Sequence, residues 1–454
     1  MQTNFSAAAL ADPQIAEADK ILRACVHCGL CTATCPTYLL LGDERDSPRG
    51  RIYLIKDMLE GGKSPTTEVG KHVDRCLSCL SCMTTCPGGV DYMHLVDIAR
   101  EKIEASGTRG IRERFQRFLI AKVVPSPWRF RLALAGAVVA KPFAGFFARV
   151  GLKPLAAMLR MAPRPGLYRP RYPLPGTFPP KITKKRRVIL LGGCAQQPLR
   201  PDINDATISL LTRLGVEVVV AQNAGCCGAL VHHLGRTGEA KAQARRNIDA
   251  WMKSASQDPV DAVIVNASGC GTMVKDYGHL FKHDPDYAKP AAEIAARALD
   301  ITEFLSTEDF GPPIRWSSLR VAYHSACSMQ HGQQLSGPPR ALLTKAGFSV
   351  QEIAEGHICC GSAGTYNLLQ PELSGQLKSR KLANIEALSP DVVATGNIGC
   401  LTQLQPGTPI PIVHTIELID WAYGGPVPRG LEHFAGKARD VQPGRPMAAA
   451  AAKS

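Results

Sequence analysis

The feature that most constrains this chain is a run of four cysteines that occurs twice near its amino end. The first run reads CVHCGLCTATCP from Cys25 to Pro36, and the second reads CLSCLSCMTTCP from Cys76 to Pro87. Both follow the spacing C-x2-C-x2-C-x3-C-P, in which a tight loop presents three thiolates to three corners of one [4Fe-4S] cube. The fourth cysteine lies beyond the reach of its own loop and ligates the other cube in two-cluster ferredoxins.

This spacing predicts two [4Fe-4S] clusters that exchange their fourth ligands. One cluster takes Cys25, Cys28, Cys31 and Cys86, and the other takes Cys76, Cys79, Cys82 and Cys35. Zinc is the alternative, since it also uses C-x2-C pairs, but three thiols at successive two-residue gaps suit a cube better than a tetrahedral ion. The 40 residues between Cys35 and Cys76 indicate a helical insertion, and we expect the cysteines on loops between helices.

The compartment limits what the 16 cysteines of this 454-residue chain can do. The first twenty residues lack the basic start and apolar stretch of a secretory signal, so we expect a cytoplasmic protein with few disulfides. Metal ligation, redox chemistry or burial must then explain the thiols. The uninterrupted apolar run LALAGAVVA from Leu132 is shorter than the ~20 residues that a bilayer requires, so no membrane span is expected.

The net charge of +14 is concentrated in one segment. Residues 111–187 hold 18 Lys and Arg against the single acid Glu113, whereas the rest of the chain holds 35 basic and 38 acidic residues. This segment also has 11 of the 34 prolines and is interpreted as a connector. Its pieces FQRFLIAKVV and FRLALAGAVVAKPFAGFFARVGL have the composition of helices at a membrane interface, although an acidic partner or plain solvent exposure would also suit them. Without a nucleic-acid-binding motif, we expect no nucleic-acid partner.

The chain beyond Arg187 repeats internally. RVILLGGC matches RVAYHSAC, NAGCCGA matches GHICCGSAG, and DAVIVNASGC matches DVVATGNIGC. The first two cysteine positions are 32 residues apart in both halves, which are offset by 133 residues, so we interpret them as a duplicated domain. The repeated thiols are Cys194, Cys226, Cys227 and Cys270, then Cys327, Cys359, Cys360 and Cys400.

In each half, β-branched runs such as VEVVV alternate with helical stretches, which predicts βαβ units and a parallel sheet. Cys194, Cys270, Cys327 and Cys400 follow predicted strands, at the sheet edge where ligands gather. Adjacent cysteines normally point apart, and Gly228 or Gly361 behind each pair can adopt the positive φ that turns both inward.

This arrangement resembles the "CCG" domain of heterodisulfide reductase subunits, lactate-utilisation proteins and the iron-sulfur subunits of anaerobic glycerol-3-phosphate dehydrogenase and glycolate oxidase. With the amino-terminal cysteine runs and SPRGRI at Ser47 to Ile52, the chain is most similar to the glycolate oxidase iron-sulfur subunit family over about residues 15 to 425. The fullest family pattern ends in C-x2-C, but Met273 and Gln403 stand at the last positions here. This departure argues against a five-thiolate centre, and either a further cluster or structural cysteines remain open. The nearby histidines are weak ligand candidates: His232, His233, His324 and His357.

The resemblance implies an electron-transfer subunit of a flavin-linked 2-hydroxy-acid dehydrogenase. FAD on partner subunits would oxidise glycolate to glyoxylate, and this chain would pass electrons towards membrane quinone from the cytoplasmic face of the inner membrane. No G-x-G-x-x-G opening a βαβ unit supports flavin or nicotinamide binding by this chain. The alternatives are a glycerol-3-phosphate or lactate dehydrogenase subunit, a thiol-disulfide reductase acting through the repeats, and a zinc-dependent binding protein.

The predicted fold is therefore an α+β multidomain chain. A helical two-cluster ferredoxin domain (residues 1–110) precedes the basic connector (111–186). Two α/β CCG repeats with parallel sheets follow (187–315 and 316–430), and a disordered tail (431–454) ends the chain.

Overall fold

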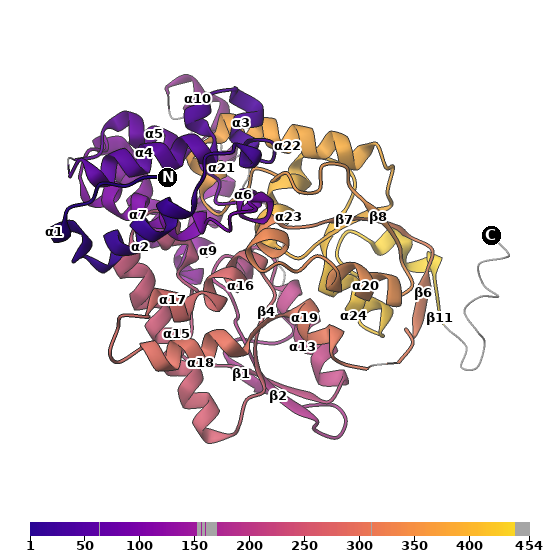
Figure 1. Ribbon diagram of the computed structural model, residues 1–454. Coiled ribbons are helices and arrows are strands. Elements are labelled where there is room, and N and C mark those ends of the chain that lie inside the picture. The colour runs from indigo at the N-terminus through magenta and orange to yellow at the C-terminus, as the bar shows by residue number, and fades with distance from the viewer. Residues whose placement is uncertain (63, 152–155, 157–158, 160–169, 310, 441–454) are drawn as a thin grey trace.

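The computed structural model describes residues 1–440 apart from 63, 152–155, 157–158, 160–169 and 310. A helical amino-terminal domain packs against two sheet-containing repeats, as Figure 1 shows in indigo to purple, magenta to salmon, and orange to yellow. This arrangement confirms the predicted fold class.

The amino-terminal domain is built from short helices around α7, whose buried face includes Leu95, Val96 and Ala99. The helix α4 starts where the Ser47 hydroxyl accepts a hydrogen bond from the Gly50 amide, with Pro48 at its first position. The predicted helical insertion between the cysteine runs is thus confirmed. The elements are α1 (Ala7–Leu10), α2 (Pro13–Ala24), η1 (Leu30–Thr32), α3 (Pro36–Leu41), η2 (Glu44–Asp46), α4 (Pro48–Glu60), α5 (Thr67–Asp74), α6 (Ser81–Thr85) and α7 (Tyr92–Ala105).

The basic connector is more integrated into the fold than its composition suggested. Ile120 and Ala121 of the first connector helix are buried in the core of the first repeat, and buried Arg117 pairs with Asp74 of the amino-terminal domain at 2.8 Å. This helix therefore joins two domains through its packed face. Its composition had suggested a helix at a membrane interface, and the contacts with both domains were not predicted. The connector elements are α8 (Ile111–Val123), α9 (Pro127–Ala140), η3 (Lys141–Phe143) and α10 (Ala144–Arg149).

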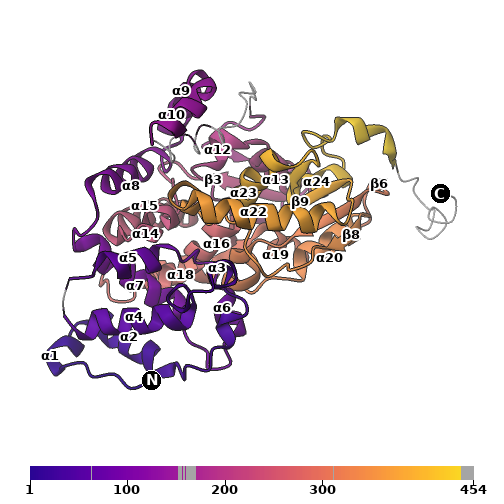
Figure 2. The ribbon, with the colours of Figure 1, turned by 90° about the horizontal axis from the view of Figure 1, so that it is seen from above.

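The segment Pro127–Phe147 protrudes from the surface, as α9 and α10 do in Figure 2. It reaches the length and apolar composition of a membrane-crossing helix, with a mean hydropathy of 1.4 over its most apolar window, of which 6% is buried. The length of this apolar segment differs from our expectation that no membrane span is present. The helical path continues past Lys141 through η3 into α10, so the apolar residues of α10 are added to those of α9.

The first repeat contains a five-stranded sheet in the order β1-β3-β2-β4-β5, parallel except for β1. Strand β1 comes from the region expected to be connector, so this repeat begins earlier than Arg187. Its elements are β1 (Gly176–Phe178), β2 (Arg186–Leu190), α12 (Gln196–Leu199), α13 (Asp202–Arg213), β3 (Val216–Val220), α14 (Ala229–His233), α15 (Thr237–Gln257), β4 (Ala262–Val265), α16 (Ser268–Lys275), α17 (Tyr277–Leu280), α18 (Ala288–Arg297), β5 (Ala298–Asp300) and α19 (Ile301–Ser306).

The second repeat contains a wholly parallel sheet in the order β10-β9-β7-β8, which reproduces β5-β4-β2-β3 of the first repeat. The predicted duplication is thus visible in strand order. Its elements are β6 (Arg315–Ser317), β7 (Arg320–His324), the π-helical turn η4 (Ser328–Gly332), α20 (Pro338–Lys345), β8 (Ser349–Glu352), α21 (Tyr366–Leu369), α22 (Pro371–Glu386), β9 (Val392–Thr395), α23 (Ile398–Leu404), η5 (Gln405–Gly407), β10 (Ile412–His414) and α24 (Thr415–Ala422).

One apolar core joins the two repeats, since buried residues of both sheets, such as Val188 and Val321, belong to one cluster. Arg200 of the first repeat also forms an ion pair with buried Glu417 of the second at 2.9 Å. The repeats are therefore fixed relative to one another.

The end of the described chain differs from the expected disordered tail. Residues 432–440 form η6 (Glu432–Lys437) and β11 (Ala438–Asp440), and β11 pairs with β6 in a two-stranded antiparallel sheet. Phe434 anchors this segment by packing into the core shared by the repeats. The remainder of that prediction, residues 441–454, lies outside the described residues.

Candidate iron-sulfur centres

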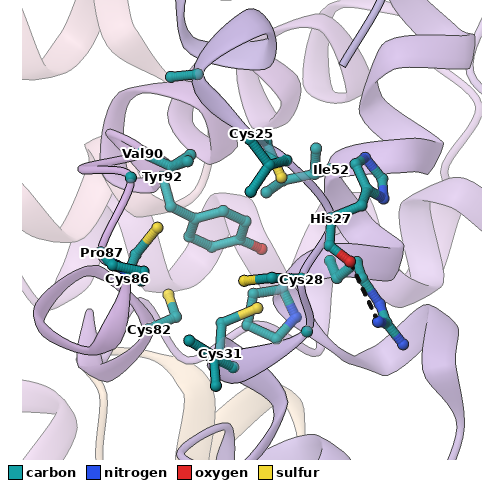
Figure 3. A pocket seen from close by; sticks show the side chains of 17 residues that line it. Cys25, His27, Cys28, Cys31, Ile52, Cys82, Cys86, Pro87, Val90 and Tyr92 are labelled. Atoms are coloured by element: carbon teal, nitrogen blue, oxygen red, sulfur yellow. Dashed lines mark hydrogen bonds between the residues drawn. The ribbon is translucent and has the colours of Figure 1, made fainter.

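The first group of thiols surrounds a pocket near the surface, the outer site. Cys25, Cys28 and Cys31 line it from the first loop, and Cys86 lines it from the second. Figure 3 shows these side chains and Cys82 directed towards a common space in front of the Tyr92 ring. The structure thus brings together the four thiols that were predicted to share a cluster.

The second group of thiols surrounds an interior pocket, the inner site. Cys76 and Cys79 line it together with Cys82, which borders both pockets, and Cys35 joins them from the first loop. The fourth cysteine of each run therefore lies beside the other loop, as the predicted exchange of ligands requires.

The two loops share an unusual backbone. His27 and Gly29 have φ values of 58° and 84°, and the corresponding Ser78 and Leu80 have 49° and 61°. Positive φ is uncommon outside glycine, so its recurrence at matched positions shows that both runs curl in the same way. The curl places three cysteines of each run around one pocket.

A buried polar network surrounds Cys35 of the inner site. The guanidinium of Arg51 lies 3.9 Å from the Cys35 sulfur and donates to the Thr37 hydroxyl at 3.0 Å. Its charge is paired with the Asp46 carboxylate at 3.4 Å, and both side chains are almost fully buried. Burial opposes the charge, but the phenol of Tyr92, the thiols of Cys76 and Cys35, and Asp46 raise the pKa of Arg51 above its usual range.

Two further donors point at Cys76. The Tyr92 hydroxyl donates to its sulfur at 3.7 Å and the Ser78 amide at 3.4 Å. Hydrogen bonds to the sulfurs and burial are the levers by which a protein sets cluster potential. Sequence reasoning missed Arg51 and Tyr92 as functional residues; the SPRGRI motif, which contains Arg51, was the available signal.

The thiols of both sites must lose their protons to act as metal ligands. Burial raises the pKa of Cys31 to about 11, and burial together with the Cys327 thiol raises that of Cys79 well above its usual range. Such thiols are protonated at neutral pH and become thiolates only when a metal compensates their charge. The donor set, four thiols converging on each pocket, suits a [4Fe-4S] cube.

The repeated cysteines form two compact series. Thiol contacts run from Cys194 through Cys226 and Cys227 to Cys270, and from Cys327 through Cys359 and Cys360 to Cys400. The Cys327 and Cys359 sulfurs are 3.8 Å apart. Cys270 and Cys400 lie inside α16 and α23, one turn later than the strand ends where we expected them.

The glycine behind each cysteine pair adopts the predicted conformation, with φ of 96° at Gly228 and 87° at Gly361. A side chain there would also meet backbone, since an added Cβ at Gly361 would lie 2.6 Å from the Ser374 carbonyl oxygen. This confirms the role that we predicted for these glycines.

The second repeat touches the inner site directly. Leu77 and Cys79 of the amino-terminal domain share a buried cluster with Ile358, Cys359 and Leu377, against which Cys327 packs. The Thr84 hydroxyl and the His331 ring, 2.7 Å apart, make a second link. The inner site therefore lies between the outer site and the thiols of the second repeat.

The histidines singled out from the sequence have different surroundings. His232 and His233 lie 3.6 Å and 4.0 Å from the Asp97 carboxylate of α7. The carbonyl of His357 lies 3.3 Å from the ring of His331. His324 lies beside the thiols of Cys360 and Cys400. Burial lowers its pKa to about 3, so its imidazole is neutral at physiological pH.

Fold and thiol geometry together define an iron-sulfur protein with a dicluster domain and a duplicated cysteine-rich domain. Family models agree: residues 21–90 match a 4Fe-4S dicluster domain, and residues 188–275 and 321–405 each match a cysteine-rich domain called CCG.

The comparison with curated relatives narrows this class. The chain is 42% identical to the glycolate oxidase iron-sulfur subunit of Escherichia coli, over 93% of this chain and 99% of that protein. It is 32% identical to the probable glycolate oxidase iron-sulfur subunit of Bacillus subtilis, over 84% and 88% of the two chains. It belongs to the glycolate oxidase iron-sulfur subunit family.

More distant similarities cover parts of the chain or the fold alone. The lactate utilization protein A of Oceanobacillus iheyensis is 28% identical over 52% of this chain and 96% of its own. A crystal structure of a hypothetical protein from Helicobacter pylori superposes with a TM-score of 0.51 at 11% identity, covering 91% of this chain and 73% of that one. The latter supports the fold only.

Proposed function

We propose that this chain carries electrons singly from a flavin-bearing partner subunit that oxidises glycolate, or a closely related 2-hydroxy acid, towards membrane quinone. Oxidation of glycolate to glyoxylate releases two electrons and two protons, whereas a [4Fe-4S] cluster exchanges one electron at a time. The observation that carries the proposal is the sequence of sites: the outer site reaches the surface, and the inner site lies behind it.

The surface around the outer site suits the docking of such a partner. Cys28 is exposed, and the neighbouring apolar side chains of Val26 and Leu30 are also exposed. Exposed apolar groups beside a redox centre favour a close protein contact that excludes water. The chain's own residues thus hold the outer cluster near a partner and bury the inner one, with Arg51 supplying a positive charge beside it.

The test is reconstitution with the flavoprotein subunit and measurement of glycolate-dependent reduction of a soluble quinone analogue. We expect the Cys28→Ser variant to lose this activity, whereas Thr32→Ser, a conservative change in the same loop, keeps it. Undiminished quinone reduction by Cys28→Ser would refute the relay. Testing lactate and glycerol 3-phosphate with the same complex separates glycolate oxidation from the alternative substrates.

We also propose that Pro127–Phe147 attaches the complex to an anionic membrane surface. Its large exposed apolar side chains include Trp128, Leu132, Val139, Phe143 and Phe146. Arg129, Arg131 and Lys141 supply positive charge along it, and Arg149 follows it in the sequence. Each basic residue near an anionic surface contributes about 1 kcal/mol, and inserted aromatic and aliphatic groups add to it.

Sedimentation with vesicles containing anionic phospholipid tests this attachment. We expect the Leu132→Ser/Val139→Ser/Phe143→Ser variant to remain in the supernatant while its clusters stay intact. Release of the unmodified chain by alkaline carbonate would support surface attachment; retention would show that the segment crosses the bilayer instead. Equal sedimentation of variant and unmodified chain would contradict a membrane role for this segment.

A further inference from the structure

A cavity of about 400 Å³ lies at the point where the protruding segment leaves the body of the molecule. The turn between α8 and α9 lines one part of it, and α15 of the first repeat lines another. The cavity shares no lining residue with the pockets of the outer and inner sites. It is therefore a separate feature that the electron path does not use.

Positive charge exceeds negative charge around this cavity. Lys122, Arg129 and Arg246 line it, and Glu239 is the one acid among the described residues of its wall. The Glu239 carboxylate is already paired, with Lys122 at 3.2 Å and with Arg236, which lies outside the wall, at 2.5 Å. Arg129 and Arg246 have no ion pair with an acid in the described part of the chain. These two uncompensated charges favour an anionic occupant.

The amino end of α9 adds to this positive potential. Ser126, the N-cap residue, and Arg129 in the first turn both line the cavity. No side chain caps this end of the 14-residue helix by a hydrogen bond. The first amides of a helix have no partner within the helix, and together with the helix dipole they favour a phosphate group or another anion.

The amide side chain of Gln243 gives an independent indication of a ligand. Gln243 lines the cavity from α15 and is 9% exposed. Its Oε1 is buried and has no hydrogen-bond partner among the residues that the structure describes. An unpaired buried acceptor is costly, so its retention calls for an explanation. A ligand that places a hydroxyl donor beside its phosphate would satisfy this oxygen.

The position of the cavity indicates where such a ligand comes from. The helices α9 and α10 project from the body of the molecule in Figure 2, and the cavity lies at the base of α9. Trp128, next to the lining residue Arg129, is 60% exposed. Tryptophan is enriched at the boundary between membrane and water, at the level of the lipid head groups. The cavity therefore lies at head-group depth if the segment enters a membrane.

We infer that this cavity binds the head group of one anionic glycerophospholipid that carries hydroxyls, of which phosphatidylglycerol is an example. The phosphate binds between Arg129, Arg246 and the amino end of α9. A head-group hydroxyl donates to Gln243 Oε1, and the acyl chains extend along the exposed apolar side chains of α9. A neutral quinone ring fits less well, because it would leave both arginines without an anion.

The inference rests on the proposed membrane attachment for the source of its ligand. It adds a saturable site that takes one lipid molecule and selects it by its head group, whereas attachment through basic and apolar side chains depends on overall charge and insertion. The two are tested separately, because a lipid with short acyl chains is soluble and binds without a membrane.

The test is calorimetric titration of the full chain, with its clusters intact, with dihexanoyl phosphatidylglycerol below the concentration at which it forms micelles. We expect one site per chain. Arg246→Gln should weaken binding about 10-fold or more, because a hydrogen bond to a charged group is lost. Gln243→Leu should weaken it several-fold through loss of a neutral hydrogen bond. Arg131→Gln makes the same change of charge on the protruding segment outside the cavity, so it should leave the affinity unchanged.

Two further ligands identify what the cavity selects. Inorganic phosphate lacks acyl chains and dihexanoyl phosphatidylcholine lacks a hydroxyl donor, so we expect both to bind at least about 10-fold more weakly. The paramagnetic resonance signals of the two amino-terminal clusters serve as the control for folding of each variant. Equal weakening by Arg246→Gln and Arg131→Gln would overturn the inference. So would equal affinity for any of the three ligands, or tighter binding of a short-chain ubiquinone.

The variant Leu132→Ser/Val139→Ser/Phe143→Ser separates the cavity from the attachment. None of the three residues lines the cavity, so this variant should bind the soluble lipid as the unmodified chain does while it remains in the supernatant of the vesicle assay. Selective binding of phosphatidylglycerol by a chain that fails to sediment with vesicles would refute the attachment and support the head-group site. Sedimentation with vesicles but no binding of the soluble lipid would refute the head-group site and leave the attachment standing.

Discussion

The two four-cysteine loops have the same spacing and the same backbone turns, yet their surroundings differ. Val26 in the first loop is 75% exposed, whereas Leu77 at the same position of the second loop is 5% exposed. The second repeat covers the second loop through Ile358, Cys359 and Leu377. The motif therefore determines which thiols lie together, whereas the domain packed against each loop determines whether its site faces solvent or the second repeat.

Burial alone would make the inner site harder to reduce, because an added electron is less well solvated there. Arg51 offsets this effect, since its buried charge lies 3.9 Å from the sulfur of Cys35. The outer site is closer to solvent, and its nearby cation Arg49 is partly exposed and paired with Glu44. We therefore expect the outer site to depend on the partner surface and the inner site on its own buried charges.

Removal of a ligand from each loop should have the largest effect and tests the comparison most directly. Cys79→Ser should lose about four irons and stop electron transfer beyond the outer site, while Cys28→Ser should lose about four irons at the surface. Iron analysis and quinone reduction measure both effects. A Cys28→Ser/Cys79→Ser double variant with full quinone reduction would show that neither loop is part of the path.

Cysteine spacing predicted the two groups of thiols and the position of Cys35 and Cys86 beside the opposite loops, and the glycines behind the cysteine pairs predicted the positive φ at Gly228 and Gly361. These features were accessible because they follow from local spacing and from the conformational freedom of glycine. The repeated sequence also predicted two domains with parallel sheets, because each half carries its own βαβ pattern; the strand order that they share was first seen in the structure.

The surroundings of the sites could not be predicted from local pattern. That Cys79 faces Cys327 depends on contacts between residues more than 200 positions apart in the chain. The burial of α8 was missed for a similar reason, since Ile120 is apolar in either a membrane or a core. Composition records that a side chain is apolar but does not identify what covers it.

Removal of the buried charge at the inner site should have the next largest effect. Arg51→Met leaves Asp46 buried with one partner fewer, so we expect a loss of about 3 to 5 kcal/mol in the free energy of unfolding. The reduction potential of the inner cluster should also fall, because a positive charge near it is lost. Denaturant unfolding and a redox titration under anaerobic conditions measure the two changes.

Arg49→Met is the matched control for this charge. Arg49 is partly exposed and pairs with Glu44 at 2.7 Å, so its loss should cost at most about 1 kcal/mol. Equal destabilisation by the two substitutions would mean that burial does not distinguish the loops.

Removal of iron by a chelator should distinguish the two sites by a smaller effect, namely a difference in the rate at which their clusters are lost. Cys28 of the outer site is exposed, whereas Cys35, Cys76, Cys79 and Cys82 of the inner site are all buried. We therefore expect an iron chelator to bleach the outer cluster several-fold faster than the inner one, with two phases in the visible absorbance. The slow phase should vanish in Cys79→Ser and the fast phase in Cys28→Ser. Bleaching in a single phase would contradict different access to the two sites.

The smallest expected effect comes from a single hydrogen bond at the boundary between the sites. Tyr92 borders both pockets, but its hydroxyl donates to Cys76 of the inner site. A hydrogen bond of this kind contributes about 0.5 to 1.5 kcal/mol. Since 59 mV corresponds to about 1.4 kcal/mol for one electron, Tyr92→Phe should lower the inner potential by about 20 to 60 mV.

The outer potential should stay unchanged in Tyr92→Phe, because the ring that faces the outer thiols is retained. Redox titration followed by paramagnetic resonance resolves the two clusters in one sample. A shift of the outer potential as large as that of the inner one would show that Tyr92 acts through the packing of its ring on both sites. A shift confined to the inner cluster would show that the reduction potentials of the two clusters are set separately, although their loops share one sequence pattern. The hydrogen bond from Tyr92 to the sulfur of Cys76 would then act on one cluster alone.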